Sequence, residues 1–171
     1  MRRIFSYFSL TIVLVVFLSN SAAAKRAESI SLPFKLDNKS WTFGSQTRMG
    51  TFLVPKGQTV QNWRELITLQ FYPNFKKTPP KEFMNHFLAH LHKNEPAVKS
   101  KYISSSFDNA LAEWNISNSK RCPNQHGLDR VMKGPQGLHV IHYAIKTNNW
   151  SQTDRNKWLN ILNKAKISKA Q

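Results

Sequence analysis

The sequence predicts a single α+β domain, in which an antiparallel sheet of about five to seven strands is covered by two amphipathic helices. Short apolar alternations separated by turn residues occur before residue 73 and again from 101 to 146, a pattern typical of antiparallel strands. Two other segments, 78–92 and 151–165, repeat their apolar residues at helical spacing. The chain has 171 residues, which is enough for one core and one domain after loss of a targeting segment.

An export signal is predicted at the N-terminus. Arg2 and Arg3 precede a short apolar run, Leu10–Leu18, and small residues follow up to Ala24. The apolar run is shorter than the roughly 18 residues that a membrane-spanning helix needs, which disfavours the alternative of a single-pass anchor. We therefore expect no transmembrane span after cleavage, a periplasmic or secreted location, and this division: signal peptide at 1–24, cleavage after Ala24, and a single domain at 25–171.

The first part of the mature chain predicts a loose leader, followed by two or three antiparallel strands. The leader is expected at 25–30, where the apolar residues follow neither strand nor helix spacing. Turn residues occupy Asp37–Lys39. Strands are predicted where apolar residues alternate around this turn: 31–36 (interrupted at Pro33), 41–43 and 49–54.

A central strand is predicted at Arg64–Tyr72. It follows a tight turn at Pro55–Gly57 and a single helical turn at Thr59–Trp63. We interpret Trp63 and Glu65 as a corner that joins the N-terminal strands to this strand. Alternation predicts a half-buried strand with these side chains on its apolar face: Ile67, Leu69 and Phe71.

The first helix is predicted from Pro79 to His92, with Thr78 as its N-cap. One face of this helix is apolar: Phe83, Met84, Phe87, Leu88 and Leu91. The last helix follows a capping pattern at Ser151 and Asp154. Its apolar stripe contains Trp158, Ile161, Leu162 and Ala165, and the basic tail after Lys164 is expected to fray.

The region between the two helices predicts four more strands. Residues 101–106 form a weak candidate, and 110–116 form a second, although Ala, Leu and Glu there also permit a helix. A polar loop over 117–127 contains Cys122. Two apolar alternations then flank Gly134–Gly137, which predicts a hairpin of 128–133 and 138–146.

The net charge of the chain is strongly positive, at +16, and it stays at +14 when Arg2 and Arg3 leave with the signal peptide. Such a charge favours solubility and attraction to anionic partners, and it carries no information about the fold. The aromatic residues follow strand and helix periods, so we interpret them as core residues rather than as a stacking platform for nucleic acid.

One candidate anion-binding site is predicted where three lysines surround the start of the first helix: Lys76, Lys77 and Lys81. A helix N-terminus attracts anions, and lysines add positive charge to it. The alternative is an ordinary solvated basic loop, because short runs of charge usually face the solvent.

The histidines do not predict a metal site. His86 and His90 have the spacing of a zinc motif, but Phe87 replaces the glutamate that the zinc-protease motif needs. His139 and His142 differ by three positions on a predicted strand, so they should point to opposite faces. We expect no metal and no cofactor.

Cys122 is the single cysteine, so the domain cannot contain an internal disulfide bond. His126 and Asp129 follow it closely, and a thiol nucleophile with a base and an orienting acid is one hypothesis for this loop. The other is an unreactive cysteine or one paired with another chain. Paired catalytic carboxylates, a serine-hydrolase motif and a phosphate-binding glycine loop are not found, so the sequence favours a non-enzyme and no catalytic residue is assigned.

From Val54 to Phe71 the chain resembles small, functionally uncharacterised exported proteins of Gram-negative bacteria. The resemblance lies in a Pro-x-Gly turn, Trp63 with Glu65, and the apolar strand that follows; residues 137–147 and the final helix with its tryptophan also look similar. The order of strands and helices is similar to Mog1/PsbP-type folds. That resemblance implies a binding or accessory subunit rather than an enzyme.

The sequence thus predicts an exported, non-catalytic binding or accessory protein of the cell envelope or the extracellular space. The partner is unknown; an anionic envelope component or an acidic protein would suit the positive charge. Two alternatives remain. One is a thiol-dependent or hydrolytic enzyme that uses the Cys122 loop, and the other is a basic protein that binds nucleic acid or a phosphorylated lipid.

Overall fold

The computed structural model describes residues 28–32, 37–47 and 50–169. The predicted signal peptide and its cleavage position lie outside these residues, as do positions 25–27 of the leader and positions 33–36 of the first predicted strand. Within the described ranges, no helix is both long enough and apolar enough to cross a membrane.

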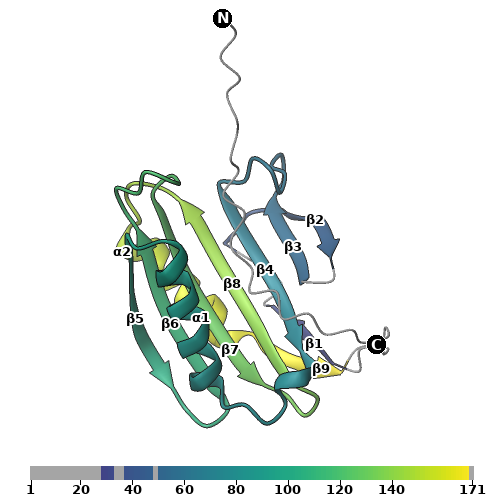
Figure 1. Ribbon diagram of the computed structural model, residues 1–171. Helices are drawn as coiled ribbons and strands as arrows, with labels where there is room; N and C mark the ends of the chain where they lie inside the picture. Colours follow the sequence, from purple (N-terminus) through teal and green to yellow (C-terminus); the bar gives the residue numbers. More distant parts are fainter. Residues whose placement is uncertain (1–27, 33–36, 48–49, 170–171) are drawn as a thin grey trace, which may run out of the picture.

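The main sheet has seven antiparallel strands, which confirms the predicted α+β class (Figure 1). Across the sheet, the strands lie in the order β2 (Trp41–Thr47), β3 (Gly50–Pro55), β4 (Glu65–Tyr72), β8 (Leu138–Lys146), β7 (Gln125–Lys133), β6 (Asn109–Ile116) and β5 (Val98–Ser105).

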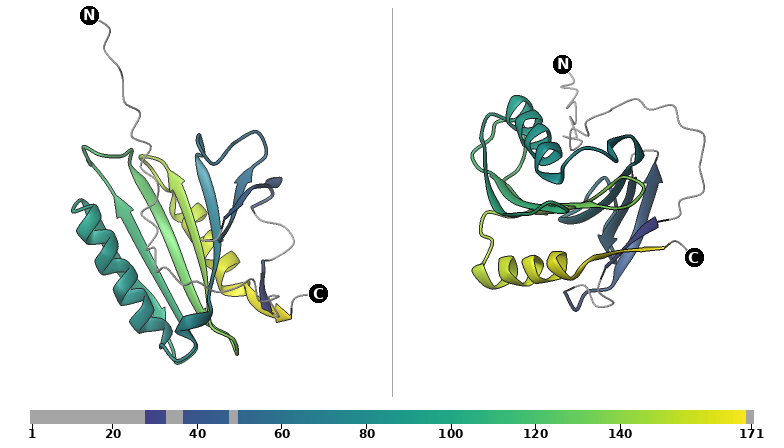
Figure 2. Two further views of the ribbon diagram at one scale, coloured as in Figure 1. Left: turned by 45° about the vertical axis from the view of Figure 1, so that its right-hand side comes forward. Right: turned by 90° about the horizontal axis from the view of Figure 1, so that it is seen from below.

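The two helices lie on opposite faces of this sheet (Figure 2). Helix α1 (Pro80–Asn94) packs against β5, β6 and β7, and helix α2 (Gln152–Lys164) packs against β7 from the other side. The part of the sheet that contains β2 and β3 extends past both helices (Figure 2). The expectation that two helices cover the sheet is therefore met only in part.

A second sheet joins the two ends of the described chain. Strand β1 (Glu28–Ser31) runs antiparallel to β9 (Lys166–Lys169), with Ile30 opposite Ile167. Both isoleucines pack against the core on the α2 side. The predicted loose leader is therefore wrong for 28–30, and the predicted frayed tail is wrong for 166–169. Each segment takes its backbone partners from the other end of the described chain; Ser29 and Ser168, for example, are paired although they are 139 positions apart.

One turn precedes β2, and a polar loop follows β3. Asp37 and Asn38 form the predicted turn, with φ angles of 56° and 52°. The predicted helical turn at Thr59–Trp63 is wrong, because Asn62 instead closes a polar loop. Its side-chain oxygen accepts hydrogen bonds from the backbone N–H and the hydroxyl of Thr59, both at 2.8 Å.

Strand β4 is more buried than predicted, because it pairs along its full length with β8 in the middle of the sheet. Leu66 packs on the α1 side and Ile67 on the α2 side, so the strand is covered on both faces. The 128–133 and 138–146 hairpin is confirmed, with β7 starting three residues earlier at Gln125. The 110–116 segment is a strand, as preferred over a helix.

The helices differ in how they start. Helix α1 begins one residue later than predicted, with Pro79 rather than Thr78 at the N-cap and no side-chain cap. Helix α2 has the predicted cap, because the Ser151 hydroxyl accepts a hydrogen bond from the N–H of Asp154 at 3.0 Å. The buried side chains of each helix match the predicted stripes: Phe83, Met84 and Leu88 in α1, and Trp158, Ile161 and Leu162 in α2.

The core has a layer on each face of the sheet. On the α2 side, Trp158 stacks on Tyr143 with ring centroids 3.6 Å apart, and Trp41 meets Trp158 edge-on. On the α1 side, Trp63 is buried with Val54 and Leu66. Glu65 is also buried, where it binds the Lys39 ammonium at 2.6 Å and the Tyr143 hydroxyl at 3.2 Å.

Candidate functional site

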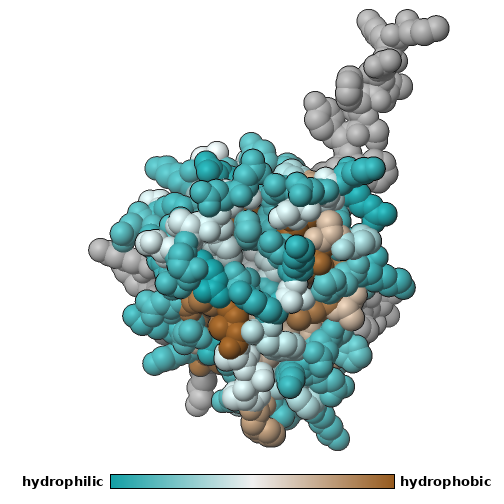
Figure 3. All heavy atoms as spheres, turned by 90° about the vertical axis from the view of Figure 1, so that its left-hand side faces the viewer, coloured by the Kyte–Doolittle hydropathy of each residue, from teal (hydrophilic) through white to brown (hydrophobic). Residues whose placement is uncertain are grey.

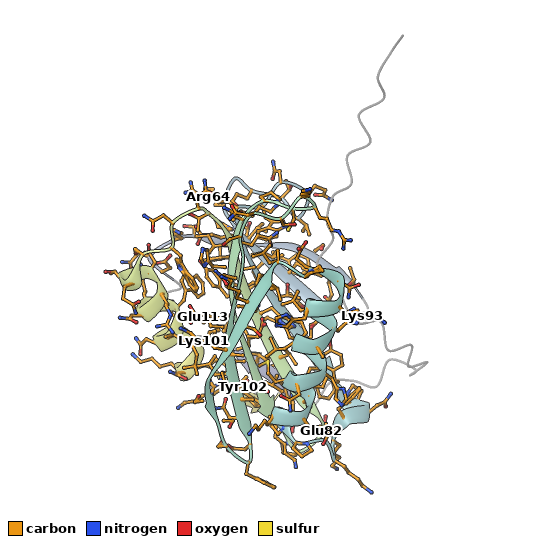
Figure 4. The ribbon with its side chains drawn as sticks, turned by 60° about the vertical axis from the view of Figure 1, so that its left-hand side comes forward. Arg64, Glu82, Lys93, Lys101, Tyr102 and Glu113 are labelled. Carbon is orange, nitrogen blue, oxygen red and sulfur yellow. The ribbon has the colours of Figure 1, made fainter. Side chains whose placement is uncertain are left out.

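An open groove runs between helix α2 and the β5–β7 edge of the sheet. We call it the basic groove and define it by Lys99, Lys101, Glu113, His126, Trp150 and Arg155. Its volume is about 290 Å³, close to the lower end of the range for small-molecule sites. Lys101 and Glu113 can be seen on the α2 side of the sheet, away from Glu82 and Lys93 on α1 (Figure 4).

The floor of the groove follows from strand register. Lys99, Asn115 and His126 are cross-strand neighbours in one row, and Lys101 and Glu113 face each other in the next row. Directly paired residues project from the same face of a sheet. Three consecutive strands therefore present their polar side chains together, beside the start of α2.

The wall of the groove comes from the segment that leads into α2. The Trp150 ring lies 5.5 Å from the His126 ring, measured between centroids. Arg155, in the first turns of α2, donates two hydrogen bonds of 2.8 Å to the two carboxylate oxygens of Glu113. Lys101 approaches the same carboxylate at 3.4 Å. One acid thus holds two cations in place across the groove.

The groove keeps an excess of positive charge. Burial alone would raise the pKa of Glu113, but the contacts of Arg155 and Lys101 outweigh burial and hold this pKa below its usual value. Burial lowers the pKa of His126, which favours the neutral form of this ring. Lys99 is exposed, and no acid among the described residues pairs with it. Three cations therefore face one carboxylate.

Trp150, a wall residue of the groove, has an unpaired hydrogen-bond donor. The indole Nε1 of Trp150 is buried, and no acceptor for it exists within the described part of the chain. An unpaired buried donor is costly, and a ligand that accepts its hydrogen bond recovers that cost. The surface seen along β5 is mostly hydrophilic, with small hydrophobic patches on it (Figure 3). These features suit an anion attached to a ring, with the ring against Trp150.

The predicted lysines lie elsewhere. Lys76 and Lys77 follow the short helix η1 (Pro73–Phe75), and Lys81 lies in the first turn of α1. All three are exposed, and Lys81 Nζ lies 6.0 Å from the centre of the Tyr102 ring. Pro79 and Pro80 remove two N–H donors at the start of α1, which weakens its ability to bind an anion. The site at Lys76, Lys77 and Lys81 stays a prediction, with less geometric support than the basic groove.

The residues of the thiol hypothesis are separated. Cys122 is buried, with its Sγ 3.8 Å from a carboxylate oxygen of Glu95. Burial raises the pKa of this thiol, and the charge of Glu95 raises it further, which is the wrong direction for a thiolate nucleophile. His126 instead contacts Trp150 in the basic groove, with the two rings tilted by 49°. Asp129 instead binds His142 at 2.7 Å, so no Cys–His–Asp arrangement forms from these three residues.

The histidines lie as their spacing predicts. His139 binds Glu28 at 3.1 Å, and His142 binds Asp129 on the opposite face of β8. His86 is exposed and His90 is half-buried. Among the residues that the structure covers, no group of three or more His, Cys, Asp or Glu side chains could hold a metal ion.

Sequence reasoning missed Lys99, Trp150 and Arg155 as members of one site. The alternation of Lys99 and Lys101 along an edge strand was a usable signal, and so was a tryptophan directly before a helix cap. That these residues lie together in one groove could not be predicted from the sequence, because it depends on strand register. No protein-family model matches the chain, and no curated protein matches it significantly.

Proposed function

We propose that this protein is an exported, non-catalytic binding or accessory protein of the cell envelope or the extracellular space, which binds a small anion in the basic groove. The observation that supports the proposal most is the convergence of Lys99, Lys101 and Arg155 beside the Trp150 ring. We keep the resemblance to Mog1/PsbP-type folds as part of this proposal, since it implies an accessory role.

The proposed ligand carries a phosphate or a carboxylate on a sugar or another ring. Lys99 lacks an acidic partner among the described residues, so it can meet the anion without breaking an ion pair. Lys101 and Arg155 both contact the carboxylate of Glu113, which holds their side chains beside the groove. Their positive charges add to the attraction of an anion. Charge-assisted hydrogen bonds of this kind contribute about 1.5–3 kcal/mol each.

Calorimetric titration of the mature domain tests the anion site. The probes are inorganic phosphate, glucose 6-phosphate and a single-stranded oligonucleotide. We expect the sugar phosphate to bind more tightly than inorganic phosphate, because Trp150 contacts the ring, and we expect the affinity to fall as salt rises. The double variant Lys99→Gln/Lys101→Gln should weaken binding about tenfold or more.

The matched control is Lys76→Gln/Lys77→Gln, which removes the same charge from the other candidate site. It should leave the affinity for the sugar phosphate within about twofold, since surface charges at a distance are screened. If this control loses binding while the groove variant keeps it, the anion site lies at the start of α1. If the oligonucleotide binds far more tightly than the sugar phosphate, the nucleic-acid alternative replaces the small ligand.

Export is tested separately. Expression of the full chain in a Gram-negative host should give a processed protein in the periplasm or the medium, and N-terminal sequencing should start at Lys25. A full-length protein that stays in the cytoplasm would contradict the export part of the proposal and leave the groove untouched.

A further inference from the structure

A second hollow, enclosed by helix α1 and the sheet, contains unpaired buried polar atoms. We call it the α1 cavity and define it by Phe87, His90, Leu91, Trp114, Asp129 and Ala144. Its volume is about 50 Å³, which is room for a few atoms only. Residues of α1 line this cavity, and α1 and α2 lie on opposite faces of the sheet (Figure 2). The α1 cavity and the basic groove are therefore on different faces, although Trp114 belongs to both linings.

Three polar atoms of the lining have no hydrogen-bond partner among the described residues: Asp129 Oδ2, Trp114 Nε1 and His90 Nε2. Asp129 is fully buried and Trp114 is 6% exposed. The carboxylate of Asp129 uses its other oxygen to bind His142 Nδ1 at 2.7 Å, and His142 Nε2 lies 2.7 Å from the side-chain oxygen of Gln70. This network holds Asp129 in position through Oδ1 and leaves Oδ2 without a partner among the described residues.

The indole of Trp114 is held in place by a glycine. A Cβ atom at Gly127 would lie 2.2 Å from the Trp114 ring and 2.7 Å from its Nε1. Only a residue without a side chain lets the indole lie this close to strand β7. Gly127 is directly opposite Trp114 in the strand register. The sequence therefore makes specific room for this indole at the edge of the cavity.

The charge of the lining is the opposite of that of the whole chain. Among the described residues, the lining contains two acids, Asp129 and Glu95, and two histidines, His90 and His142, but no lysine or arginine. Arg121 lies at the outer end, where it donates a hydrogen bond to the carbonyl oxygen of Asn94 at 2.7 Å. In a chain of net charge +16, this is a local acidic and aromatic environment. Such an environment favours a cation over an anion.

We propose that the α1 cavity binds a small primary ammonium group of about two to four heavy atoms. The ammonium would donate to Asp129 Oδ2, and its short alkyl part would contact Phe87, Leu91 and Ala144. Aromatic faces of Phe87 and Trp114 add cation–π attraction. Phe87, His90 and Leu91 are half-buried, so α1 forms the outer wall of the cavity. The ammonium can come from a free amine or from the headgroup of a larger molecule.

Titration followed by NMR tests this site on the intact mature domain. The probe is ethylammonium chloride, and the reporter is the indole N–H resonance of Trp114, identified with the Trp114→Phe variant. Molecules of this size bind in the micromolar to millimolar range at best, so the titration must extend to tens of millimolar. Sodium acetate, which has a similar size and the opposite charge, is the matched control ligand. Phosphoethanolamine is a second, larger amine probe. It tests whether the cavity accepts an ammonium group that is attached to a bulky headgroup or only a free amine.

We expect ethylammonium to shift the Trp114 indole resonance saturably and acetate not to shift it. The variant Asp129→Asn should weaken ethylammonium binding at least tenfold. A shift by ethylammonium that persists in Asp129→Asn, a shift by acetate instead, or no saturable shift would overturn the proposal. If phosphoethanolamine also shifts Trp114, the site accepts a headgroup; if it does not, the site accepts free amines only, and either result supports an ammonium site.

Asp129 contacts His142, so Asp129→Asn can lower the stability of the domain, and a second variant is needed. Ala144→Val adds two methyl groups to the cavity wall and removes no charge. We expect it to abolish the ethylammonium shift while the circular dichroism spectrum stays unchanged. Ethylammonium binding that is unaffected by Ala144→Val would place the ligand outside the cavity and overturn the assignment. Sugar phosphate binding in the basic groove should be unchanged in both variants, which separates this proposal from the first.

Discussion

Replacing Trp63 by alanine tests whether the Trp63–Glu65 corner is part of the fold or a binding site. The Trp63 side chain is 7% exposed and packs with Val54 and Leu66. Lys146 Nζ lies 4.0 Å from the centre of its ring. Truncating a large buried aromatic side chain costs about 3–5 kcal/mol, and losing a cation–π contact adds about 0.5–1 kcal/mol.

We therefore expect Trp63→Ala to lower the free energy of unfolding by about 3.5–6 kcal/mol. For a domain of this size, each kcal/mol lowers Tm by about 2–4 °C, so Tm should fall by about 7–24 °C. Thermal unfolding followed by circular dichroism measures this change. Phe43→Ala is the control, because Phe43 is 62% exposed and its loss should change the stability by about 0.5 kcal/mol or less.

The variant Lys146→Met separates the two contributions of the corner. Burial lowers the pKa of Lys146, so its ammonium is partly desolvated beside the indole. Replacement by methionine keeps most of the packing and should cost only the cation–π part, about 0.5–1 kcal/mol. An unchanged Tm in Trp63→Ala, together with lost binding of the sugar phosphate, would refute the structural interpretation and identify a site.

Three further predictions concern single side chains. Cys122 should react with a thiol reagent such as DTNB much more slowly in the native domain than in urea, since burial raises its pKa; equal rates would contradict its buried position. The pKa of Glu113 is lowered in the folded chain, because Arg155 outweighs the opposing effect of burial. Its contribution to stability is therefore present above the usual value of 4.5 and is lost as the pH falls through the folded value. Urea unfolding at several pH values should show that Glu113→Gln loses less stability on acidification than the parent protein does. An identical loss in both proteins would refute this role of Glu113. Arg130 donates to the carbonyl oxygen of Leu162 at the end of α2, so Arg130→Met should lower the free energy of urea unfolding by about 1–3 kcal/mol, and no change would show that water replaces the guanidinium.

The elements with local signals could be predicted from the sequence. Ser151 and Asp154 lie three positions apart and cap α2 as predicted, because a capping bond needs only neighbouring residues. The turn at Gly134–Gly137 likewise defines the β7–β8 hairpin. At Thr59–Trp63 a polar loop forms in place of the predicted helical turn. The Asn62 side chain accepts hydrogen bonds from the N–H and the hydroxyl of Thr59, which stabilises the loop.

The features that depend on distant partners could not be predicted. Only the register of β5, β6 and β7 places Lys101 and His126 beside Glu113. Arg155 then reaches Glu113 from a helix 42 positions away. The lysines at 76, 77 and 81 were conspicuous because they are close in sequence. Proximity along the chain indicated a cluster, but the larger convergence of charge lies where three strands and a helix meet.

The pairing of β1 with β9 has a consequence for the dynamics of the domain. Ser29 and Ser168 are joined across 139 positions, and closing a loop of this length costs roughly 4 kcal/mol of chain entropy. Pairing that costs this much forms late in folding, after the seven-stranded sheet has reduced the distance between its partners. For the same reason this short sheet is the part of the described chain that should open first, and amide hydrogens in β1 and β9 should exchange with solvent before those of β4 and β8.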